Sequence, residues 1–506
     1  MNLNLKKEIF YQIYPNSFMD ADGDGYGDFQ GIVDRLDYVK DLGATAIWLN
    51  PHYVSSWKDG GYDVVDYYHA DKRFGGDAGF EKLLAEVHKR GLKLIIDLVV
   101  GHTSEDNEMF LQSASAEKSV YDDMFIWTDN ILEAPKKYEL MRGRFDRDGA
   151  YMVNYFCTQP ALNYGFRQID HANWQMDYRD ERTFQARNLI VDICLHYLKM
   201  GVDGFRVDMA DSLVKNDPDR QATIEVWHYI FGKVRAQYPQ AIFVSEWTDL
   251  DKSLAAGFDM DFMNDRENTF ANDLSRRELW DKDNVSFLLP DSKLDITENF
   301  QKTIDLINRN SKKGYISFIS CNHDTARPTR FLHGRALRLF YCILFTLPGV
   351  PFLYYGDEIV MQYQKGIPSK EGGYARTGSR TVMNWTEGKN HGFSTAPEGK
   401  LFLPVDPTTS VEKMQNDKSS LYWLVKALIS FRKSEPMLCG NEIEAIPQAD
   451  KRLLVYRRED LTVAVNPTLT EKKIDGAYNR ILFSDGNVRL DGDELILSAQ
   501  SACVIK

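Results

Sequence analysis

The sequence predicts an α/β protein: a (β/α)8 barrel with a domain inserted after the third strand and a small antiparallel β domain at the C-terminus. Short apolar runs alternate with longer stretches of helical periodicity, which is typical of parallel strands joined by helices. This alternation is interrupted once, in residues 103–172, and it ends near residue 436. The chain has 506 residues, more than a single ordinary domain needs.

Eight apolar runs read as the barrel strands. They lie at residues 9–14, 44–49, 93–100, 202–208, 241–246, 258–262, 315–320 and 351–355. A helical pattern over 80–91 feeds the third run, and Gly91 is placed to end that helix. Because the eight runs cover more than the ~250 residues of a minimal barrel, we assign 1–102 and 173–436 to a barrel with insertions.

Two segments break from the barrel pattern. Residues 103–172 are polar and aromatic, without a clear helical period, and are too long for a plain loop, so we expect an inserted domain there. Residues 437–506 contain short alternating stretches bounded by turns, such as RLLVYRR, LTVAVNP, NRILF and ELILSA. They predict a C-terminal β-sandwich domain.

Composition narrows the partners and the compartment. Hydrophobic residues at 43% and charged residues at 27% are those of a folded globular protein. A net charge of -13 argues against nucleic acid or an anionic membrane as partner, and no apolar run is long enough to span a membrane. The N-terminus lacks the apolar stretch of a secretory signal, and the six cysteines show no paired spacing. We therefore expect a cytoplasmic protein with reduced thiols and no organic cofactor; the sequence does not specify the oligomeric state.

Acids mark the ends of four predicted strands. Asp97, Asp208 and Glu246 close the third, fourth and fifth strands, and Asp324 follows the seventh. The C-terminal strand ends of a (β/α)8 barrel form one face, so these carboxyls are expected to converge on one pocket. Mutual repulsion and burial should then push their pKa values apart. The alternative is that each acid caps the following helix or forms an ion pair.

Retaining cleavage of a glycosidic bond needs two carboxyls about 5–5.5 Å apart, one ionised and one protonated. Arg206 stands two residues before Asp208, so both side chains point the same way from the strand. An arginine there favours an ionised aspartate, as a nucleophile requires. Glu246 ends an apolar strand, where desolvation raises the pKa toward that of a general acid.

Four motifs resemble the signature regions of the α-amylase superfamily of retaining glycoside hydrolases. They are DLVVGHT (97–103), GFRVD (204–208), FVSEW (243–247) and SCNHD (320–324), supported by GATAIWLNP (43–51), QPALN (159–163) and GVPFLYYGDE (349–358). The resemblance implies an α-glycosidase with Asp208 as nucleophile, Glu246 as acid/base and Asp324 as the third carboxylate. It also implies a sugar site, with Tyr62 as stacking platform, lined by Asp97, His102, Arg206 and His323.

Within this superfamily the chain is most similar to oligo-1,6-glucosidases, dextran glucosidases and related α-glucosidases. SFMDADGDGYGDFQGI (17–32) and RTVMNW (380–385), which opens with Arg380, look like their versions of these stretches. Asp59 lies three residues before Tyr62, where those exo-acting enzymes carry an acid that holds the non-reducing end. The resemblance therefore implies a binding pocket, including Asp59 and Arg380, for short isomalto- or malto-oligosaccharides.

Several positions depart from the family pattern. Gly101 replaces the asparagine that binds calcium in many α-amylases, so we expect no calcium there. Ala161 stands where QPDLN has aspartate, and Met383-Asn384 replace Met-Gln. Met209 follows the nucleophile, where valine accompanies α-1,6 and alanine or threonine α-1,4 specificity in the family, so the linkage stays open.

An acid-rich loop after the first strand follows the logic of a calcium loop. Its candidate ligands are Asp20, Asp22, Asp24, Tyr26 (through its carbonyl) and Asp28. Gly25 stands at the sixth position, but Gly31 replaces the usual glutamate at the twelfth. Since close carboxylates repel one another without a cation, we expect structural Ca²⁺, as in the similar loop of dextran glucosidases. The alternative is a solvated acidic turn.

The sequence bears on three alternatives to hydrolysis, and the first of them stays open. The same covalent intermediate could pass its glucosyl unit to a sugar, as in a transglycosylase or a sucrose or trehalose isomerase. That choice depends on acceptor-side loops, 248–270 and 359–400, which the sequence does not specify. A non-enzymatic homologue of the amino-acid-transporter heavy chains would lack the acids and carry a membrane span. An aldolase or phosphate-binding barrel would need a lysine or a glycine-rich loop that the sequence does not show.

Overall fold

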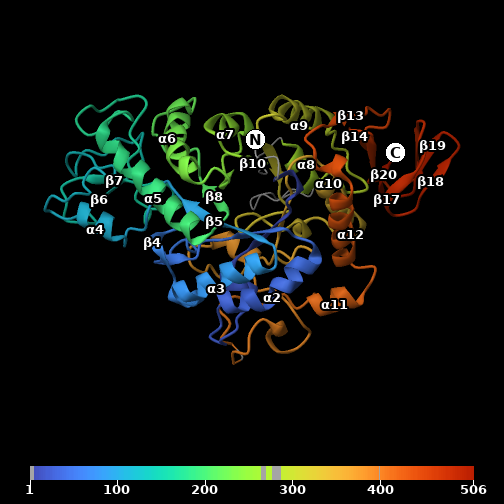
Figure 1. Ribbon diagram of the computed structural model, residues 1–506, viewed down its shortest axis with the longest axis horizontal. Helices are drawn as coiled ribbons and strands as arrows, with labels where there is room; N and C mark the ends of the chain where they lie inside the picture. Colours follow the sequence, from blue (N-terminus) through green and yellow to red (C-terminus); the bar gives the residue numbers. More distant parts are fainter. Residues whose placement is uncertain (1–4, 264–268, 276–285, 398) are drawn as a thin grey trace.

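A closed barrel of eight parallel strands forms the centre of the protein (Figure 1). The computed structural model describes residues 5–263, 269–275, 286–397 and 399–506. The barrel strands are β1 (Phe10–Ile13), β2 (Ala46–Leu49), β5 (Lys93–Val99), β8 (Gly204–Asp208), β9 (Ile242–Ser245), β10 (Met260–Met263), β11 (Tyr315–Phe318) and β12 (Phe352–Tyr354). A parallel bridge between Ile319 and Phe352 joins β11 to β12 and closes the ring. The predicted (β/α)8 barrel is confirmed. Of the acceptor-side loops, residues 264–268 and 398 lie outside the described residues.

Helices surround the barrel. They are α1 (Pro15–Phe18), α2 (Phe29–Leu42), α3 (Gly76–Lys89), α5 (Phe184–Met200), α6 (Gln221–Gln237), α7 (Leu250–Ala256), α8 (Phe270–Ser275), α9 (Thr297–Asn310), α10 (Gly334–Thr346), α11 (Val411–Asn416) and α12 (Leu421–Ser434). In α2 the buried positions Ile32, Leu36 and Val39 recur at helical spacing and face the core. Gly91 follows α3 with φ +72°, a left-handed conformation that glycine adopts freely and that ends the helix as predicted.

The segment between β5 and α5 forms the insertion. It contains α4 (Glu108–Ser113), β6 (Leu140–Arg142) and β7 (Ala150–Met152), and a hairpin of β3 (Tyr53–Ser55) and β4 (Val64–Ala70) precedes it along the chain. The insertion has its own small apolar core, which includes Ile126, Phe166 and Trp174. A bridge between His102 and Ala161 ties it to the end of β5. The boundaries 103 and 172 remain a prediction.

The C-terminal part is antiparallel, as predicted. One sheet has the order β13-β14-β15-β20-β17, from Glu444–Ala445, Leu454–Arg458, Leu461–Asn466, Ser501–Ile505 and Ile481–Asp485. The other has the order β16-β19-β18, from Lys472–Asp475, Glu494–Leu497 and Val488–Asp491. Val455 and Cys503 of the first sheet share a buried cluster with Ile474 and Leu495 of the second. In Figure 1 this part and the insertion lie at opposite ends of the long axis.

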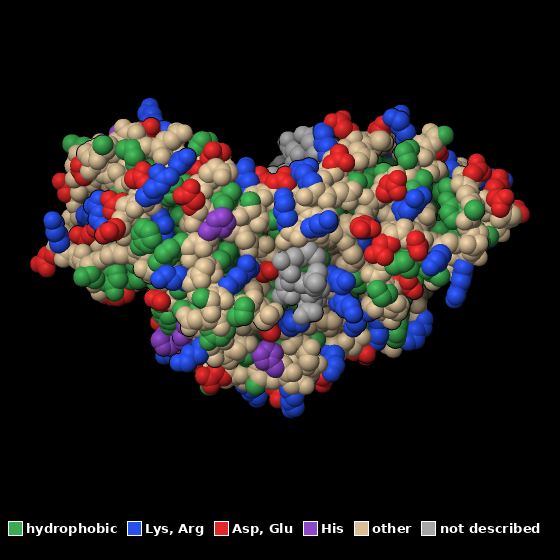
Figure 2. Space-filling model, turned by 45° about the horizontal axis from the view of Figure 1, so that its top comes forward, with side chains coloured by type: hydrophobic (Ala, Val, Ile, Leu, Met, Phe, Trp, Pro, Cys, Tyr) green, Lys and Arg blue, Asp and Glu red, His purple; other side chains and the backbone are tan. Residues whose placement is uncertain are grey.

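The outer surface carries both signs of charge. On the face in Figure 2 the acidic and basic side chains are interspersed. In the described ranges, no helix combines the length and the apolar character that crossing a membrane requires.

A buried arginine joins the C-terminal part to the barrel. Arg458 of β14 donates hydrogen bonds to the carbonyls of Leu438, Gly440, Glu442 and Thr346, at 2.5 to 2.9 Å. Thr346 is the last residue of α10, so the guanidinium also satisfies a free carbonyl at a helix C-terminus, where positive charge is favourable.

We predict that Arg458→Met lowers the free energy of unfolding by about 3 kcal/mol, because it leaves several buried carbonyls without donors. Chemical denaturation measures this loss. Arg457→Met is the matched control, since the neighbouring Arg457 side chain is 54% exposed and forms only a 3.4 Å pair with Glu444. Equal losses in the two variants would contradict the prediction.

Candidate active site

One buried arginine connects three of the strand-end acids. Arg206 Nη1 lies 2.7 Å from Asp97 Oδ1 and 2.9 Å from Asp208 Oδ1, and Nη2 lies 2.8 Å from Glu246 Oε1. The guanidinium is fully buried. These residues come from β5, from β8 and from the residue after β9, so adjacent parallel strands deliver them to the same end of the barrel. One side chain therefore contacts Asp208 and Glu246 together.

Burial dominates the ionisation of this group. It raises the pKa of both Asp208 and Glu246 to about 7, although Arg206 acts to lower them. Burial also raises the pKa of Asp97 to about 6. The neighbouring acids add to the increase. The sequence predicted that Arg206 keeps Asp208 ionised, but burial and these acids outweigh the effect of the arginine on the pKa of Asp208. Instead the arginine is shared among three carboxylates.

Asp324 behaves in the opposite way. Its Oδ1 accepts hydrogen bonds from Arg376 at 3.0 Å and Arg380 at 2.9 Å, and its Oδ2 lies 3.0 Å from His323 Nε2. Burial acts to raise its pKa, but His323 and the two arginines hold it well below the usual range. The expected separation of pKa values therefore lies between Asp324 and the Asp208–Glu246 pair.

Two neutral histidines, His102 and His323, belong to the same network of side chains. Burial lowers the pKa of His102 and of His323 to about 4. His323 Nδ1 lies 3.0 Å from the amide nitrogen of Gln12, which can only donate, so the ring proton sits on Nε2 and faces Asp324. The Tyr62 ring stacks on His323 at 5.1 Å, with 8° between the planes. One face of Tyr62 is therefore covered by His323, and the ring is fixed in orientation.

A further carboxylate, that of Asp59, lies at one end of this network of side chains. Asp59 Oδ1 lies 2.8 Å from Arg376 Nη2, and its Oδ2 accepts from Gln159 at 2.8 Å. Asp63 fixes the turn that carries Asp59, because its carboxylate accepts the backbone N–H groups of Lys58 and Asp59. Arg376 thus bridges Asp59 and Asp324.

All the predicted catalytic and sugar-binding residues meet in this one network. They are Asp59, Tyr62, Asp97, His102, Arg206, Asp208, Glu246, His323, Asp324 and Arg380. Sequence reasoning missed Arg376, which lies in η5 (Tyr374–Ser379), a 3-10 turn without strand register. From the sequence, Arg376 could have been found only by asking which additional cation balances so many acids in one pocket.

Lys215 contacts Asn154 and Ser212, the residues whose side chains would lie closest to a Cβ at Gly101. Its half-buried ammonium donates to Asn154 Oδ1 at 2.8 Å and to the carbonyl of Ser212 at 2.7 Å. A side chain at Gly101 would collide with Asn154, whose amide nitrogen would lie 2.5 Å from an added Cβ. The Lys215 hydrogen bonds thus join Asn154 of the insertion to the barrel segment that follows Met209.

The acidic loop lies apart from this network. Asp20, Asp22 and Asp28 each offer a carboxylate oxygen, all within 4.8 Å of one another. Asp24 is exposed and caps the N–H of Tyr26 at 2.8 Å. A Cβ at Gly31 would lie 2.0 Å from the carbonyl of Met19, so no larger residue fits at the twelfth loop position.

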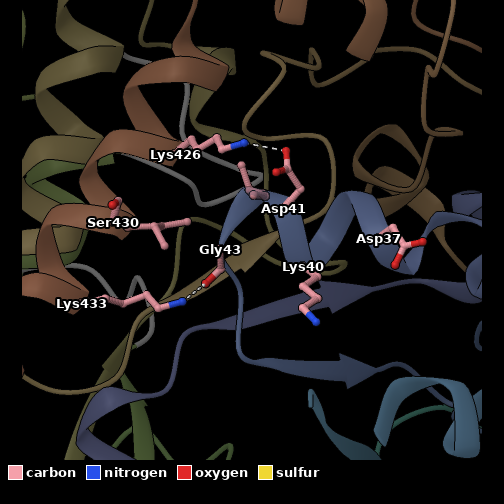
Figure 3. A pocket seen from close by; sticks show the side chains of 9 residues that line it. Asp37, Lys40, Asp41, Gly43, Lys426, Ser430 and Lys433 are labelled. Atoms are coloured by element: carbon pink, nitrogen blue, oxygen red, sulfur yellow. Dashed lines mark hydrogen bonds and ion pairs between the residues drawn. The ribbon is translucent and has the colours of Figure 1, made fainter. Parts of the chain in front are cut away.

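A surface hollow of about 510 Å³ lies between α2 and α12 (Figure 3). Lys426 pairs there with Asp41 at 2.6 Å, and Lys433 donates to the carbonyl of Gly43 at 3.3 Å. None of the strand-end acids lines it, so it does not compete with the barrel site.

The fold, with paired carboxylates at the C-terminal strand ends, defines a glycoside hydrolase barrel. The family model "Alpha amylase, catalytic domain" matches residues 12–440, and the chain belongs to this family. An α-amylase 3 of Dictyoglomus thermophilum is 27% identical, covering 99% of this chain and 93% of that protein. An oligo-1,6-glucosidase of Heyndrickxia coagulans is 28% identical and covers 91% of each. An isomaltulose synthase variant from Erwinia rhapontici NX5, solved with sucrose, shares the fold with a TM-score of 0.83 at 22% identity, covering 99% of this chain and 98% of that one.

We predict that Arg206→Leu lowers the free energy of unfolding at pH 8 by about 3–5 kcal/mol, because three buried carboxyls lose their counter-charge. Without Arg206 their folded-state pKa values rise further above the unfolded values. Below the wild-type values of about 6 to 7 both folded proteins hold these protons, so the penalty grows only as pH rises from about 6 toward the further raised values, and it is smaller at pH 5 than at pH 8. Denaturation at both pH values tests this.

Arg309→Leu serves as the control for this measurement. Arg309 pairs with Asp251 on the surface, where both side chains are more than 40% exposed. Its loss should be below about 1 kcal/mol. A pH-independent penalty for Arg206→Leu would contradict the charge-compensation argument.

Proposed function

We propose that this α-amylase-family enzyme hydrolyses α-glucosidic bonds in short isomalto- or malto-oligosaccharides, with retention of configuration. Asp208 would attack the anomeric carbon while Glu246 protonates the leaving oxygen, giving a covalent glycosyl-enzyme. Water, activated by Glu246, would then release the sugar. The observation that carries the proposal is the Asp208–Arg206–Glu246 contact, which places two carboxyls beside one buried cation.

The ionisation of this pair supports the assignment. Burial raises the pKa of both carboxyls to about 7, and the charge of Asp208 adds to the increase at Glu246. A raised pKa keeps Glu246 available as a proton donor near neutral pH, as a general acid requires. Asp324 is ionised under the same conditions and would accept hydrogen bonds from sugar hydroxyls.

The closed end of the site supports a short substrate. Asp59, Arg376 and Asp324 form a continuous ion-pair bridge, and the Asp59 side chain is only 6% exposed. A terminal glucosyl unit could bind against this bridge, whereas a chain running through the site would have to break it. This is the geometry expected of an exo-acting enzyme, and a relative named oligo-1,6-glucosidase agrees with it. A cytoplasmic location remains part of the proposal, supported by six free cysteines.

We predict that Asp208→Asn abolishes turnover, lowering kcat at least about a thousandfold, because the nucleophile is lost. The test incubates both proteins with maltose, isomaltose, trehalose, sucrose, panose and soluble starch, and follows the products by chromatography. Asp211→Asn is the control, since Asp211 lies three residues further on and pairs with Arg220. Glucose from one or two short substrates supports the proposal and identifies the linkage.

Other outcomes of this test point elsewhere. New oligosaccharides or sugar isomers would assign a glucosyl transferase or isomerase, which uses the same intermediate. Full activity of Asp208→Asn would remove Asp208 from the mechanism.

We also propose that the acidic loop binds a structural calcium ion. Carboxylate oxygens of Asp20, Asp22 and Asp28 converge, and burial together with neighbouring acids raises the pKa of Asp22 and Asp28. A cation would remove this repulsion, with Asp24 and the carbonyl of Tyr26 as further candidate ligands. Because the site lies outside the carboxylate network, the ion would stabilise the loop and take no part in bond cleavage.

We predict that Ca²⁺ raises the melting temperature of EDTA-treated protein by a few degrees, since a ligand bound only by the folded state stabilises it. Asp22→Asn should weaken this response. Asp34→Asn, an exposed acid on α2, should leave it intact. If wild-type protein shows no response to Ca²⁺, the loop is a solvated acidic turn.

A further inference from the structure

A buried carboxylate outside the network of strand-end acids holds the segment that carries Glu246. Asp261 lies in β10, in register with Ser245 of β9, and is only 1% exposed. Its Oδ1 accepts hydrogen bonds from Ser245 Oγ at 2.7 Å, from Trp247 N at 3.0 Å and from Thr248 N at 3.3 Å. One oxygen atom therefore binds the chain on both sides of Glu246.

Asp261 makes these contacts from the outer face of the barrel. Its neighbours Met260 and Phe262 belong to an apolar cluster shared by strands around the barrel, and successive side chains of a strand point to opposite faces. Ser245 also contacts Ser253 of the surrounding helix α7, at 2.6 Å between the hydroxyl oxygens. The Asp261 carboxylate therefore lies on the side of α7 and can act on a bound sugar only through the Glu246 segment.

The other side of Glu246 is fixed on β8. The N–H of Glu246 donates to the carbonyl of Val207 at 3.0 Å, and the N–H of Ala210 donates to the carbonyl of Glu246 at 3.2 Å. The carboxylate contacts Arg206 Nη2 at 2.8 Å through Oε1 and the N–H of Met209 at 3.1 Å through Oε2. Both oxygens thus depend on where the backbone of Glu246 lies between β8 and β10.

The backbone that follows Glu246 adopts an unfavourable conformation. Thr248 has φ +63°, in the left-handed region that β-branched residues rarely enter. Such conformations persist where the surrounding contacts impose them. Asp261 binds the N–H of Thr248, and α7 begins directly afterwards with Asp249 as its N-cap. Asp261 therefore supplies one of the contacts that this conformation requires.

The interaction depends on an acceptor atom and not on charge. Among the described residues, Asp261 Oδ2 has no hydrogen-bond partner. Burial raises the pKa of Asp261 to about 7, although Ser245 and the backbone N–H groups act to lower it. A proton on Oδ2 leaves the three hydrogen bonds at Oδ1 intact. Asparagine, which keeps one such oxygen, is therefore a conservative replacement.

We propose that Asp261 is a positioning residue for the acid/base: by binding the chain on both sides of Glu246, it fixes the Glu246 carboxyl relative to Asp208 and to the leaving oxygen. A general acid must lie within hydrogen-bond reach of the atom that it protonates, and a displacement of about 1 Å is costly. This inference rests on the proposed glycosidase function, in which Glu246 donates the proton.

The first test varies the need for a proton. Cleavage of a disaccharide requires protonation of the leaving oxygen, whereas fluoride leaves α-glucosyl fluoride without it, and kcat/KM reports this first step. In Asp261→Leu, the ratio of kcat/KM for the disaccharide to that for the fluoride should fall about ten- to a hundredfold. Asp261→Asn, which keeps the acceptor, should stay within about threefold of the wild-type ratio.

Asp259→Leu is the matched control. Asp259 also binds β9 from the chain next to it, accepting the N–H of Phe243 at 2.9 Å and pairing with Arg235 at 3.0 Å, but further from Glu246. Its loss should lower stability and leave the ratio unchanged. Equal ratios in Asp261→Leu and Asp259→Leu, or equal falls in Asp261→Asn and Asp261→Leu, would overturn the inference.

Ser245→Ala decides the question if Asp261→Leu does not fold. This variant removes one donor to Asp261 and keeps the carboxylate, so the ratio should fall about two- to fivefold. An unchanged ratio would then count against a positioning role.

A second test needs no turnover. Crystal structures of the wild type, Asp261→Leu and Asp259→Leu give the distances from Glu246 Oε1 to Arg206 Nη2 and from Glu246 Oε2 to Met209 N. At least one of them should lengthen beyond about 3.5 Å in Asp261→Leu only. That result supports the positioning role even if the wild type hydrolyses nothing, whereas unchanged distances in Asp261→Leu contradict it.

Discussion

The shared guanidinium of Arg206 is the interaction on which the rest of the site depends. Three carboxyls from adjacent strands converge where burial disfavours their charged forms, and one fully buried cation contacts all three. A single cation does not neutralise three anions, and the pKa of each of these carboxyls is raised. The grouping is a consequence of strand register, since parallel pairing brings Asp97 opposite Arg206.

The outer part of the site is built differently. Asp324 is surrounded by Arg376, Arg380 and His323, and it stays ionised in spite of its burial. The two arginines come from the irregular segment after the eighth strand and the neutral His323 from the segment after the seventh, which the barrel alone does not position. Asp208 and Glu246 therefore have raised pKa values, whereas the pKa of Asp324 is lowered. A sugar ring bound in this site would contact carboxyls of both kinds.

Contacts between distant segments hold the opening in place. Arg73 stacks against Tyr26 of the acidic loop and pairs with Glu371, which leads into the turn that carries Tyr374 and Arg376. Ser394 also donates to Asp20 at 2.6 Å. The acidic loop and the turn that carries Tyr374 and Arg376 are therefore joined through Arg73 and Glu371.

The sequence by itself determined the barrel, the eight strands and the acids that end them, because period-2 and helical patterns and strand-end positions are local properties. It did not identify Arg376, whose position depends on an irregular segment after the eighth strand that brings it to Asp59 and Asp324. It also placed Arg206 beside Asp208 without revealing that Glu246 and Asp97 share it. Charge sharing and burial depend on which side chains meet in space, and only the tertiary structure decides that.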